Sequence, residues 1–363
     1  MTLSQDILAE LADIAPNSAL AEARAVREAA TRHAQGSYET LFGQEEEDFP
    51  LSERFAVAAK VAKLHQADAL AAHYAGFGLA DPTSPRLIPA LGFARLLTFT
   101  PIEATPSALQ ALTHAGWSLR TVVTLAQLIA FVSFQSRLIA GLRLLNGKPT
   151  ASAETPVVAG FWHTAPQTVS GRRAPVHFTR DELGWEPWIA AKPLDEFSED
   201  ERNILAKYGH SDSPYFRLLA RNQPLLEQRT LTDKGIFYTP GGLPRAEREL
   251  AATVASKING CIYCASVHAR KAAQLAKEET AVETLLAVTP GDNLGDGQSA
   301  RWQAEIDFAA AVSVTPSALN AAHLAAVERQ GLDTLAQLDL LQSAAFFAWA
   351  NRLMLTLGEP FTD

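Results

Sequence analysis

The chain contains very little cysteine. Only two occur in 363 residues, Cys261 and Cys264, and they are separated by two residues. A cytosolic location is expected from the N-terminal residues, and in that compartment a CxxC pair is more often catalytic or metal-binding than a structural bridge. Two thiols placed together therefore indicate a dithiol that is used chemically.

Other absences exclude whole classes of partner. The net charge is −9 and no Lys/Arg-rich run occurs, so nucleic acid is not an expected partner. Polar residues interrupt every apolar stretch well short of the ~20 residues that a membrane span needs, so none is expected. The N-terminus lacks a basic region followed by an apolar core. These features predict a cytoplasmic protein.

The residues around the cysteines favour a redox site. Asn259-Gly260 is a turn signal, so Cys261 and Cys264 should lie in the first turn of a helix. Helical spacing then places both sulfurs and the His268 ring on one face. Unpaired N–H groups and the positive end of the helix dipole stabilise a thiolate there.

An internal repeat organises the chain. Residues 86–138 align without a gap on 301–353, an offset of 215 (301 minus 86), with matches such as Phe93/Phe308, Pro101/Pro316, Gly116/Gly331, Gln127/Gln342 and Arg137/Arg352. Farther upstream the offset is 193 (251 minus 58). By that alignment the first copy has Asp68, Ala71 and Ala56 where the second has Cys261, Cys264 and Glu249. The first copy thus lacks the reactive groups and is expected to be structural.

The patterns predict an all-α protein with an internally duplicated helical fold and an irregular central linker. We expect an N-terminal helical extension over 1–48, a degenerate module over 49–150 and an irregular connector containing Pro and Trp over 151–212. The catalytic module with the CxxC motif should then span 213–363. The two copies should pack with pseudo-twofold symmetry, and the chain is expected to form homo-oligomers.

The motif resembles that of a known family. Glu249, twelve residues later Cys261, then Tyr263, Cys264 and His268 are similar to the signature of the alkylhydroperoxidase D and carboxymuconolactone decarboxylase family. The segment 346–353 (FFAWANRL) is typical of its peroxidase-related branch. The resemblance implies an alkylhydroperoxidase D-like helical fold and thiol-based peroxide reduction, with no cofactor and no metal.

The resemblance also implies a role for each site residue. Cys264 would attack the hydroperoxide, and Cys261 would resolve the sulfenic acid to a disulfide. Glu249 and His268 would form a proton relay, and an unidentified lipoyl- or thioredoxin-type dithiol would reopen the disulfide. Tyr263 stands where alkylhydroperoxidase D itself has a histidine. Its hydroxyl is expected near the pocket, on a ring that mainly packs.

Several alternatives stay open at this point. The cysteines could be two buried small hydrophobes, or zinc ligands with His268 and either His210 or His323, although no second CxxC or HxxxH completes a closed site. A redox sensor or disulfide reductase would use the same residues. A non-redox lyase of the decarboxylase type would not need the cysteine pair.

Residues outside the motif are expected to be structural. Arg137, Arg352 and the neighbouring Asn351 recur at the ends of the two copies, where the arginines are expected to snorkel. Trp162, Trp185 and Trp188 of the connector are expected to pack against the helical modules.

Overall fold

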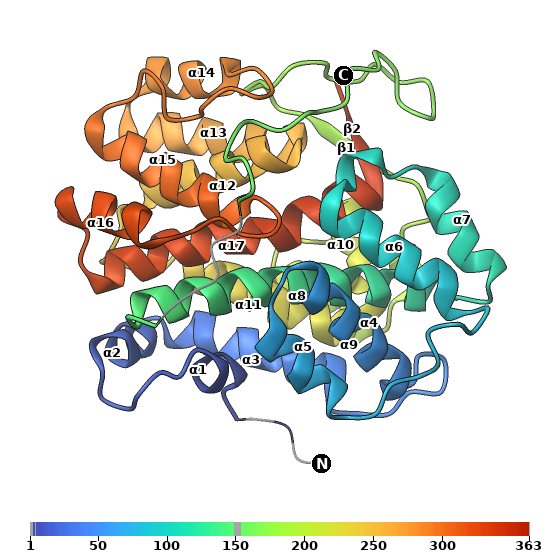
Figure 1. Ribbon diagram of the computed structural model, residues 1–363. Coiled ribbons are helices and arrows are strands. Elements are labelled where there is room, and N and C mark those ends of the chain that lie inside the picture. Colours follow the sequence, from blue (N-terminus) through green and yellow to red (C-terminus); the bar gives the residue numbers. More distant parts are fainter. Residues whose placement is uncertain (1–2, 4, 149–153, 363) are drawn as a thin grey trace.

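Two long helices run through the centre of the molecule, α8 (Leu119–Leu145) and α17 (Thr334–Thr356). The computed structural model describes residues 3, 5–148 and 154–362, and Figure 1 shows shorter helices surrounding this central pair. Within the described part of the chain the only sheet is the antiparallel pair β1 (Gly184–Pro187) and β2 (Gly358–Phe361). The all-α prediction is confirmed.

The remaining helices follow in chain order. The first half contains α1 (Ile7–Leu11), α2 (Ala19–Val26), α3 (Glu28–Phe42), α4 (Leu51–Leu64), α5 (Asp68–Ala75), α6 (Leu87–Phe99) and α7 (Pro106–His114). The second half contains α9 (Glu199–Lys207), α10 (Pro214–Leu219), α11 (Gln223–Phe237), α12 (Arg245–Asn259), α13 (Ile262–Ala276), α14 (Glu279–Ala287), α15 (Ala300–Ser313) and α16 (Ala321–Arg329). Single 3-10 turns lie at 101–103, 194–196 and 220–222.

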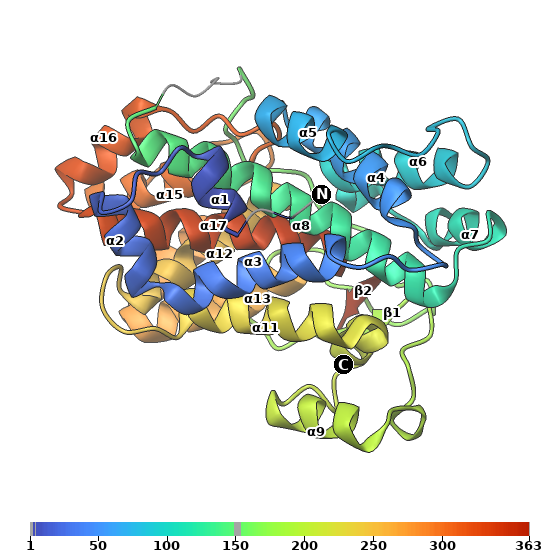
Figure 2. The same cartoon turned by 90° about the horizontal axis from the view of Figure 1, so that it is seen from below.

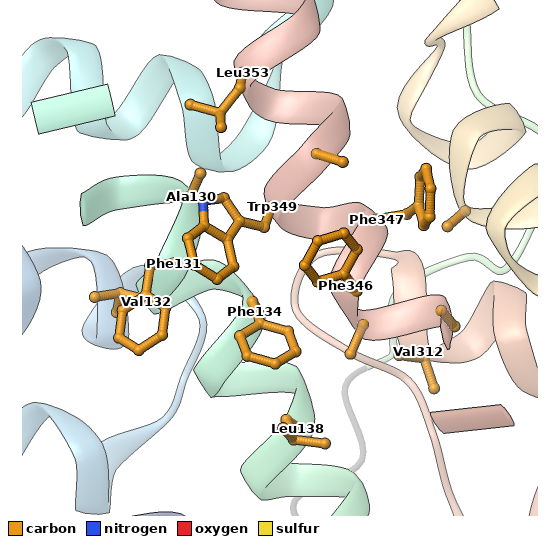
Figure 3. Close-up of a cluster of buried hydrophobic side chains, with 14 of the residues drawn as sticks. Ala130, Phe131, Val132, Phe134, Leu138, Val312, Phe346, Phe347, Trp349 and Leu353 are labelled. Atoms are coloured by element: carbon orange, nitrogen blue, oxygen red, sulfur yellow. The ribbon is translucent and has the colours of Figure 1, made fainter. Parts of the chain in front are cut away.

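Aromatic side chains join the two central helices. Phe131 and Phe134 of α8 surround the indole of Trp349 on α17, with ring centroids 5.1 and 5.8 Å from it (Figure 3). The buried Trp349 indole donates a hydrogen bond of 2.7 Å to Gln127 Oε1. Large aromatic rings bury extensive apolar area, so this contact stabilises the packing of α8 against α17.

Helix α8 has the length and apolar composition of a membrane span. Every residue of its most apolar 18-residue window is nevertheless buried inside the protein. The helix is apolar around its whole circumference because other helices cover all of its sides. It is therefore a core helix.

Helix boundaries follow the sequence offset of 215. Adding 215 to the bounds of α7 (106 and 114) gives those of α16 (321 and 329), and adding it to the start of α8 (119) gives the start of α17 (334). The glycine at 141 lets these long helices approach closely, because a Cβ there would lie 2.2 Å from Leu341 Cδ1.

Arg137 and Arg352 contradict the snorkelling expectation, since each is only 1% exposed. Arg137 Nη2 donates to the Ser313 carbonyl at 3.1 Å, and Arg352 Nη2 donates to the Thr98 carbonyl at 2.9 Å. Thr98 and Ser313 are themselves 215 positions apart (313 minus 98), so the two contacts are reciprocal. Buried carbonyls at the end of a helix need donors, and these two side chains supply them.

The helices outside the two repeats pack on one another and on the central pair. Helix α3 packs along α11, as Figure 2 shows. The described part of the connector, from 154 to 212, is largely irregular, and α9 protrudes from the rest of the molecule in Figure 2. β1 fastens this connector to the C-terminal strand, and the Trp185 indole donates to the Met354 carbonyl at 3.1 Å. The connector thereby lies beside the CxxC motif, since Trp188 of the connector and Cys261 line one pocket.

Candidate functional site

A tight turn brings α12 and α13 together at the cysteine pair. Helix α12 ends at Gly260, whose φ of 75° lies in the left-handed region that favours glycine. Glycine is also required by space, since a Cβ there would lie 2.2 Å from the Phe161 carbonyl oxygen. Cys261 is the N-cap residue of α13, and Cys264 lies in the first turn. The chain thus folds back so that α13 packs against α12.

The two thiols are free, adjacent and almost completely buried. Cys261 is 1% and Cys264 is 5% exposed, and their side chains hydrogen-bond to each other. Burial raises the pKa of the Cys261 thiol well above its ordinary value, and the neighbouring Cys264 adds to this effect. Hydrogen bonds from the Cys264 backbone and the Asn351 side chain act in the opposite direction but do not outweigh it. Cys261 therefore stays a neutral thiol at pH 7.

His268 is held by a buried carboxylate. Its Nδ1 lies 2.5 Å from Glu249 Oε2, and the Glu249 side chain is 1% exposed. Arg245 Nε and Nη2 both donate to the other carboxylate oxygen at 3.0 Å. The ring of Phe347 meets the imidazole edge-on, with centroids 4.4 Å apart. These contacts fix both the position and the rotation of the imidazole.

The Glu249 carboxyl is ionised. Burial raises its pKa, but the hydrogen bond and charge of His268, helped by Lys271 and Arg245, outweigh burial and bring the pKa below its ordinary value of 4.5. A carboxylate only accepts hydrogen bonds, so Nδ1 of His268 carries the proton. In the neutral ring, Nε2 is then left as the basic nitrogen.

Cys264 and His268 line the same cavity. Its volume is about 360 Å³, and it lies between α13, α17 and the α10–α11 region. We call it the Cys264 cavity. Arg229, Asp233 and Lys271 also line it, so ionisable side chains share the cavity with Cys264. A small polar substrate in this cavity would contact the thiol and the imidazole together.

Cys261 lines a different cavity, which we call the Cys261 cavity. Its volume is about 260 Å³, and its walls are mainly apolar. The connector supplies much of the wall, including Ala165, Val169 and Trp188, and β2 supplies Glu359. Trp188 was expected only to pack, but it borders this space and donates to Glu359 Oε1 at 2.9 Å.

Tyr263 lies between the two cavities. It lines both of them, as does Met354 on α17. Burial raises the pKa of the Tyr263 hydroxyl, and the nearby Cys264 and Cys261 raise it further. Tyr263 is therefore a neutral wall residue, with its hydroxyl protonated at pH 7.

Two side chains near the sulfurs were not selected as site residues from the sequence. The Asn351 amide contacts Cys261 and hydrogen-bonds with Asn259 and Ser256, each at 3.0 Å. The Tyr215 hydroxyl is buried, has no hydrogen-bond partner among the described residues and belongs to a side chain lining the Cys264 cavity. A sequence feature could have identified Asn351, because it lies in the segment 346–353 that is typical of the peroxidase-related branch. No sequence feature pointed to Tyr215.

The histidines considered as further zinc ligands have other contacts. His323 Nδ1 accepts a hydrogen bond from the Asn320 backbone at the start of α16. His210 lines the Cys264 cavity, and its ring stacks on Phe216 with centroids 3.7 Å apart. Over residues 3, 5–148 and 154–362, no group of three or more His, Cys, Asp or Glu side chains is placed to hold a metal ion.

The structure corrects the upstream offset of 193 by one residue. Helices α4 and α12 begin at 51 and 245, and α5 and α13 begin at 68 and 262, so the offset is 194 in both cases (245 minus 51 and 262 minus 68). The counterparts of Glu249, Cys261 and Cys264 are therefore Phe55, Ala67 and Leu70, which carry no such chemistry.

Residues 223–304 match the sequence model of the Carboxymuconolactone decarboxylase family. This range runs from the first residue of α11 into α15 and contains Glu249, Cys261, Tyr263, Cys264 and His268. No curated protein matches the chain.

Proposed function

We propose that the protein is a thiol-dependent hydroperoxidase, from the match of residues 223–304 to the carboxymuconolactone decarboxylase family and from the geometry of the cysteine pair. The observation that carries the proposal is the shared cavity of Cys264 and His268, with His268 fixed by the ionised Glu249. A nucleophilic thiol, a base and a group that orients the base are the parts that activate a cysteine.

The first step makes a thiolate and uses it. Nε2 of His268 takes the proton of the Cys264 thiol, directly or through one water. The resulting thiolate attacks the terminal, hydrogen-bearing oxygen of ROOH. The O–O bond breaks, Cys264 becomes a sulfenic acid, and RO⁻ takes the proton from His268 to leave as ROH. The Tyr215 hydroxyl, which has no protein partner in the described chain, can donate a hydrogen bond to the departing oxygen.

The second step protects the oxidised sulfur. The Cys261 thiol condenses with the sulfenic acid, which forms the Cys261–Cys264 disulfide and releases water. Cys261 is already hydrogen-bonded to Cys264, so little movement is needed. A dithiol reductant then restores both thiols. A cytoplasmic setting, proposed from the sequence, would provide such reductants.

Half-reactions test the proposal. Reduced protein is mixed with hydrogen peroxide or cumene hydroperoxide, and free thiols are counted over time by mass spectrometry. We expect two thiols to disappear per peroxide consumed, and Cys264→Ser to abolish the reaction. Cys261→Ser should still consume one peroxide and stop at a sulfenic acid that dimedone traps. Unchanged peroxide consumption in Cys264→Ser would refute the function.

Two other readings make different predictions. A redox sensor would oxidise once, and adding a dithiol reductant would not sustain peroxide consumption. A lyase of the decarboxylase type would keep its activity when both cysteines are replaced by serine. Sustained peroxide turnover that depends on Cys264 separates the hydroperoxidase from both.

We also propose that the chain is a fused pair of related helical modules, of which only the second is catalytic. The reciprocal contacts of Arg137 and Arg352 and the matching helix boundaries support this organisation. Homo-oligomer formation stays a prediction from the sequence.

A further inference from the structure

The first copy keeps a cavity at the place where the second copy has Cys261. Its volume is about 320 Å³, and we call it the first-copy cavity. Gln66 and Ala67 beside α5 and Ile139 and Ala140 on α8 form part of its wall. The positions aligned with these four, by offsets of 194 (260 minus 66) and 215 (355 minus 140), all line the Cys261 cavity: Gly260, Cys261, Met354 and Leu355. The first copy has therefore retained the space although it lacks the thiols.

We propose that the first-copy cavity binds a small organic carboxylate. The anion would lie beside the N-terminus of α5, as the Cys261 thiol lies at the N-terminus of α13. The site is outside residues 223–304 and does not depend on the hydroperoxidase proposal.

The first turn of α5 borders this space without a cap. The N-cap residue Ala67 forms no side-chain cap hydrogen bond, and the cavity wall includes Ala67, Asp68, Ala69 and Leu70. The N–H groups in the first turn of a helix have no partner within the helix, and they attract anions. In the second copy a thiol stands at the N-cap position, Cys261. The alanine of the first copy offers these N–H groups nothing in its place.

Two arginines of α8 bring positive charge to the same cavity. Arg137 lines it and is only 1% exposed, and its Nε has no hydrogen-bond partner in the described part of the chain. Arg143 also lines it, and its one hydrogen bond to a described residue is a long one, 3.3 Å from Nη1 to the Leu11 carbonyl. A guanidinium has five N–H donors and binds a carboxylate through two of them. Arg143 therefore has donors left for a ligand.

A second buried arginine adds to the charge at Arg137. Thr315 Oγ1 accepts from Arg137 Nη2 at 2.5 Å and from Arg352 Nη2 at 3.3 Å, so both guanidiniums reach one hydroxyl. Burial, and then the charge of Arg352, lower the pKa of the Arg137 guanidinium. Within residues 3, 5–148 and 154–362, their other partners are backbone carbonyls and His65, and neither arginine has a carboxylate partner. An anion beside Arg137 would offset part of the cost of these two buried charges.

His65 brings no charge of its own to the cavity. Its Nε2 lies 3.0 Å from Ser133 Oγ, and this hydroxyl donates to the Ile129 carbonyl at 2.9 Å, so it accepts from the imidazole. Burial, with the charges of Arg137 and Arg352, lowers the pKa of His65 well below its ordinary value. His65 is therefore neutral at pH 7, and the positive charge of the site comes from the arginines.

The acidic groups near the cavity are exposed. Among its described lining residues the acidic one is Asp68, which is exposed at the start of α5. Lys148, whose Nζ is 2.5 Å away, lowers the pKa of the exposed Asp13 most, and Arg143 adds a smaller contribution. Solvent and salt screen exposed charges much more than buried ones. Asp68 should therefore weaken anion binding without preventing it.

The apolar part of the wall selects an organic anion. Leu70, Ile139 and Pro316 line the cavity together with the arginines. A cavity of about 320 Å³ is large enough for a small organic molecule. A carboxylate on a short hydrocarbon or a single ring would place its charge at Arg143 and its apolar part on this wall. Phosphate would leave the apolar wall without a contact.

Titration with benzoate tests the site. Calorimetry on the reduced wild-type protein at pH 7 should show saturable binding of benzoate. Benzamide has the same shape without the charge, and phosphate has the charge without the ring, so both should bind at least about tenfold more weakly. Absence of saturable benzoate binding up to about 10 mM would overturn the proposal. Equal affinity for benzamide, or for phosphate, would also overturn it.

Charge variants locate the bound anion. Arg143→Gln should weaken benzoate binding at least about fivefold, and Asp68→Asn should strengthen it about twofold by removing a like charge. Arg329→Gln removes an exposed arginine of α16 and is the control, with affinity unchanged. Wild-type affinity in Arg143→Gln, or weaker binding in Asp68→Asn, would overturn the assignment.

A blocking variant keeps the test independent of how well Arg143→Gln folds. Ala69→Trp introduces a large side chain at an exposed position of the cavity wall and should abolish benzoate binding. Undiminished binding in Ala69→Trp would show that benzoate binds elsewhere in the molecule and would overturn the proposal.

Discussion

Glu249 and His268 lie 19 residues apart in the sequence, yet Glu249 Oε2 and His268 Nδ1 are 2.5 Å apart across the α12–α13 turn. The carboxylate has two arginine contacts on its other oxygen and is 1% exposed. The Glu249 carboxylate is therefore a rigid, ionised support for the His268 imidazole, which lines the Cys264 cavity.

Replacing this carboxylate should slow peroxide reduction. In Glu249→Gln a neutral amide replaces the carboxylate, so no negative charge holds His268 in the tautomer with the proton on Nδ1. We therefore expect the second-order rate constant for thiol loss on peroxide addition to fall by about 10²-fold. Glu247→Gln is the control, because Glu247 pairs with Arg301 instead of His268. Equal rate constants in Glu249→Gln and the wild type would contradict the relay.

The same pair should make stability depend on pH in the acid range. The folded-state pKa of Glu249 lies below its ordinary value of 4.5. Its stabilising contribution is then fully present above pH 4.5 and is lost as the pH falls through the folded-state pKa. Urea unfolding of the wild type and Glu249→Gln should show a difference in unfolding free energy that shrinks as the pH drops below 4.5. A difference independent of pH would show that ionisation of Glu249 does not contribute.

Asn351 should control the resolving step. Its hydrogen bond lowers the pKa of the Cys261 thiol against the effect of burial. Asn351→Leu removes this hydrogen bond, so Cys261 should react more slowly with the Cys264 sulfenic acid. The sulfenic acid should then persist longer and give several-fold more dimedone adduct at a fixed time after peroxide addition. Ser136→Ala is the control at the aligned position of the first copy (351 minus 215). An unchanged dimedone adduct would limit Asn351 to a packing role.

The buried arginines should matter for folding rather than for chemistry. Arg352→Met leaves the buried Thr98 carbonyl without its side-chain donor, and we expect a loss of about 2–3 kcal/mol in the free energy of unfolding. The exposed Arg329→Met should change it by no more than about 0.5 kcal/mol. Chemical denaturation measures both, and equal stability of the two variants would show that the Arg352 contacts contribute nothing.

The sequence determined the local features of this protein. Helical periodicity gave the all-α class, and the Asn259-Gly260 turn indicated that a helix starts at the cysteines, where α13 begins after Cys261. Such features depend on residues within a few positions of one another, so spacing alone reveals them. The structure also brings Glu249 to His268, through a turn whose sequence signal was visible.

Only the tertiary structure decided what surrounds the sulfurs. Tyr215 reaches the Cys264 cavity from a separate helix, and Ala165 and Trp188 border Cys261 from an irregular connector. Arg352 looked like a helix-end residue with its guanidinium in water, but it donates to carbonyls of α6 and α17 in the interior. Long-range packing sets these positions, because which distant side chain fills a given space depends on the assembled helices and leaves no periodic trace in the chain.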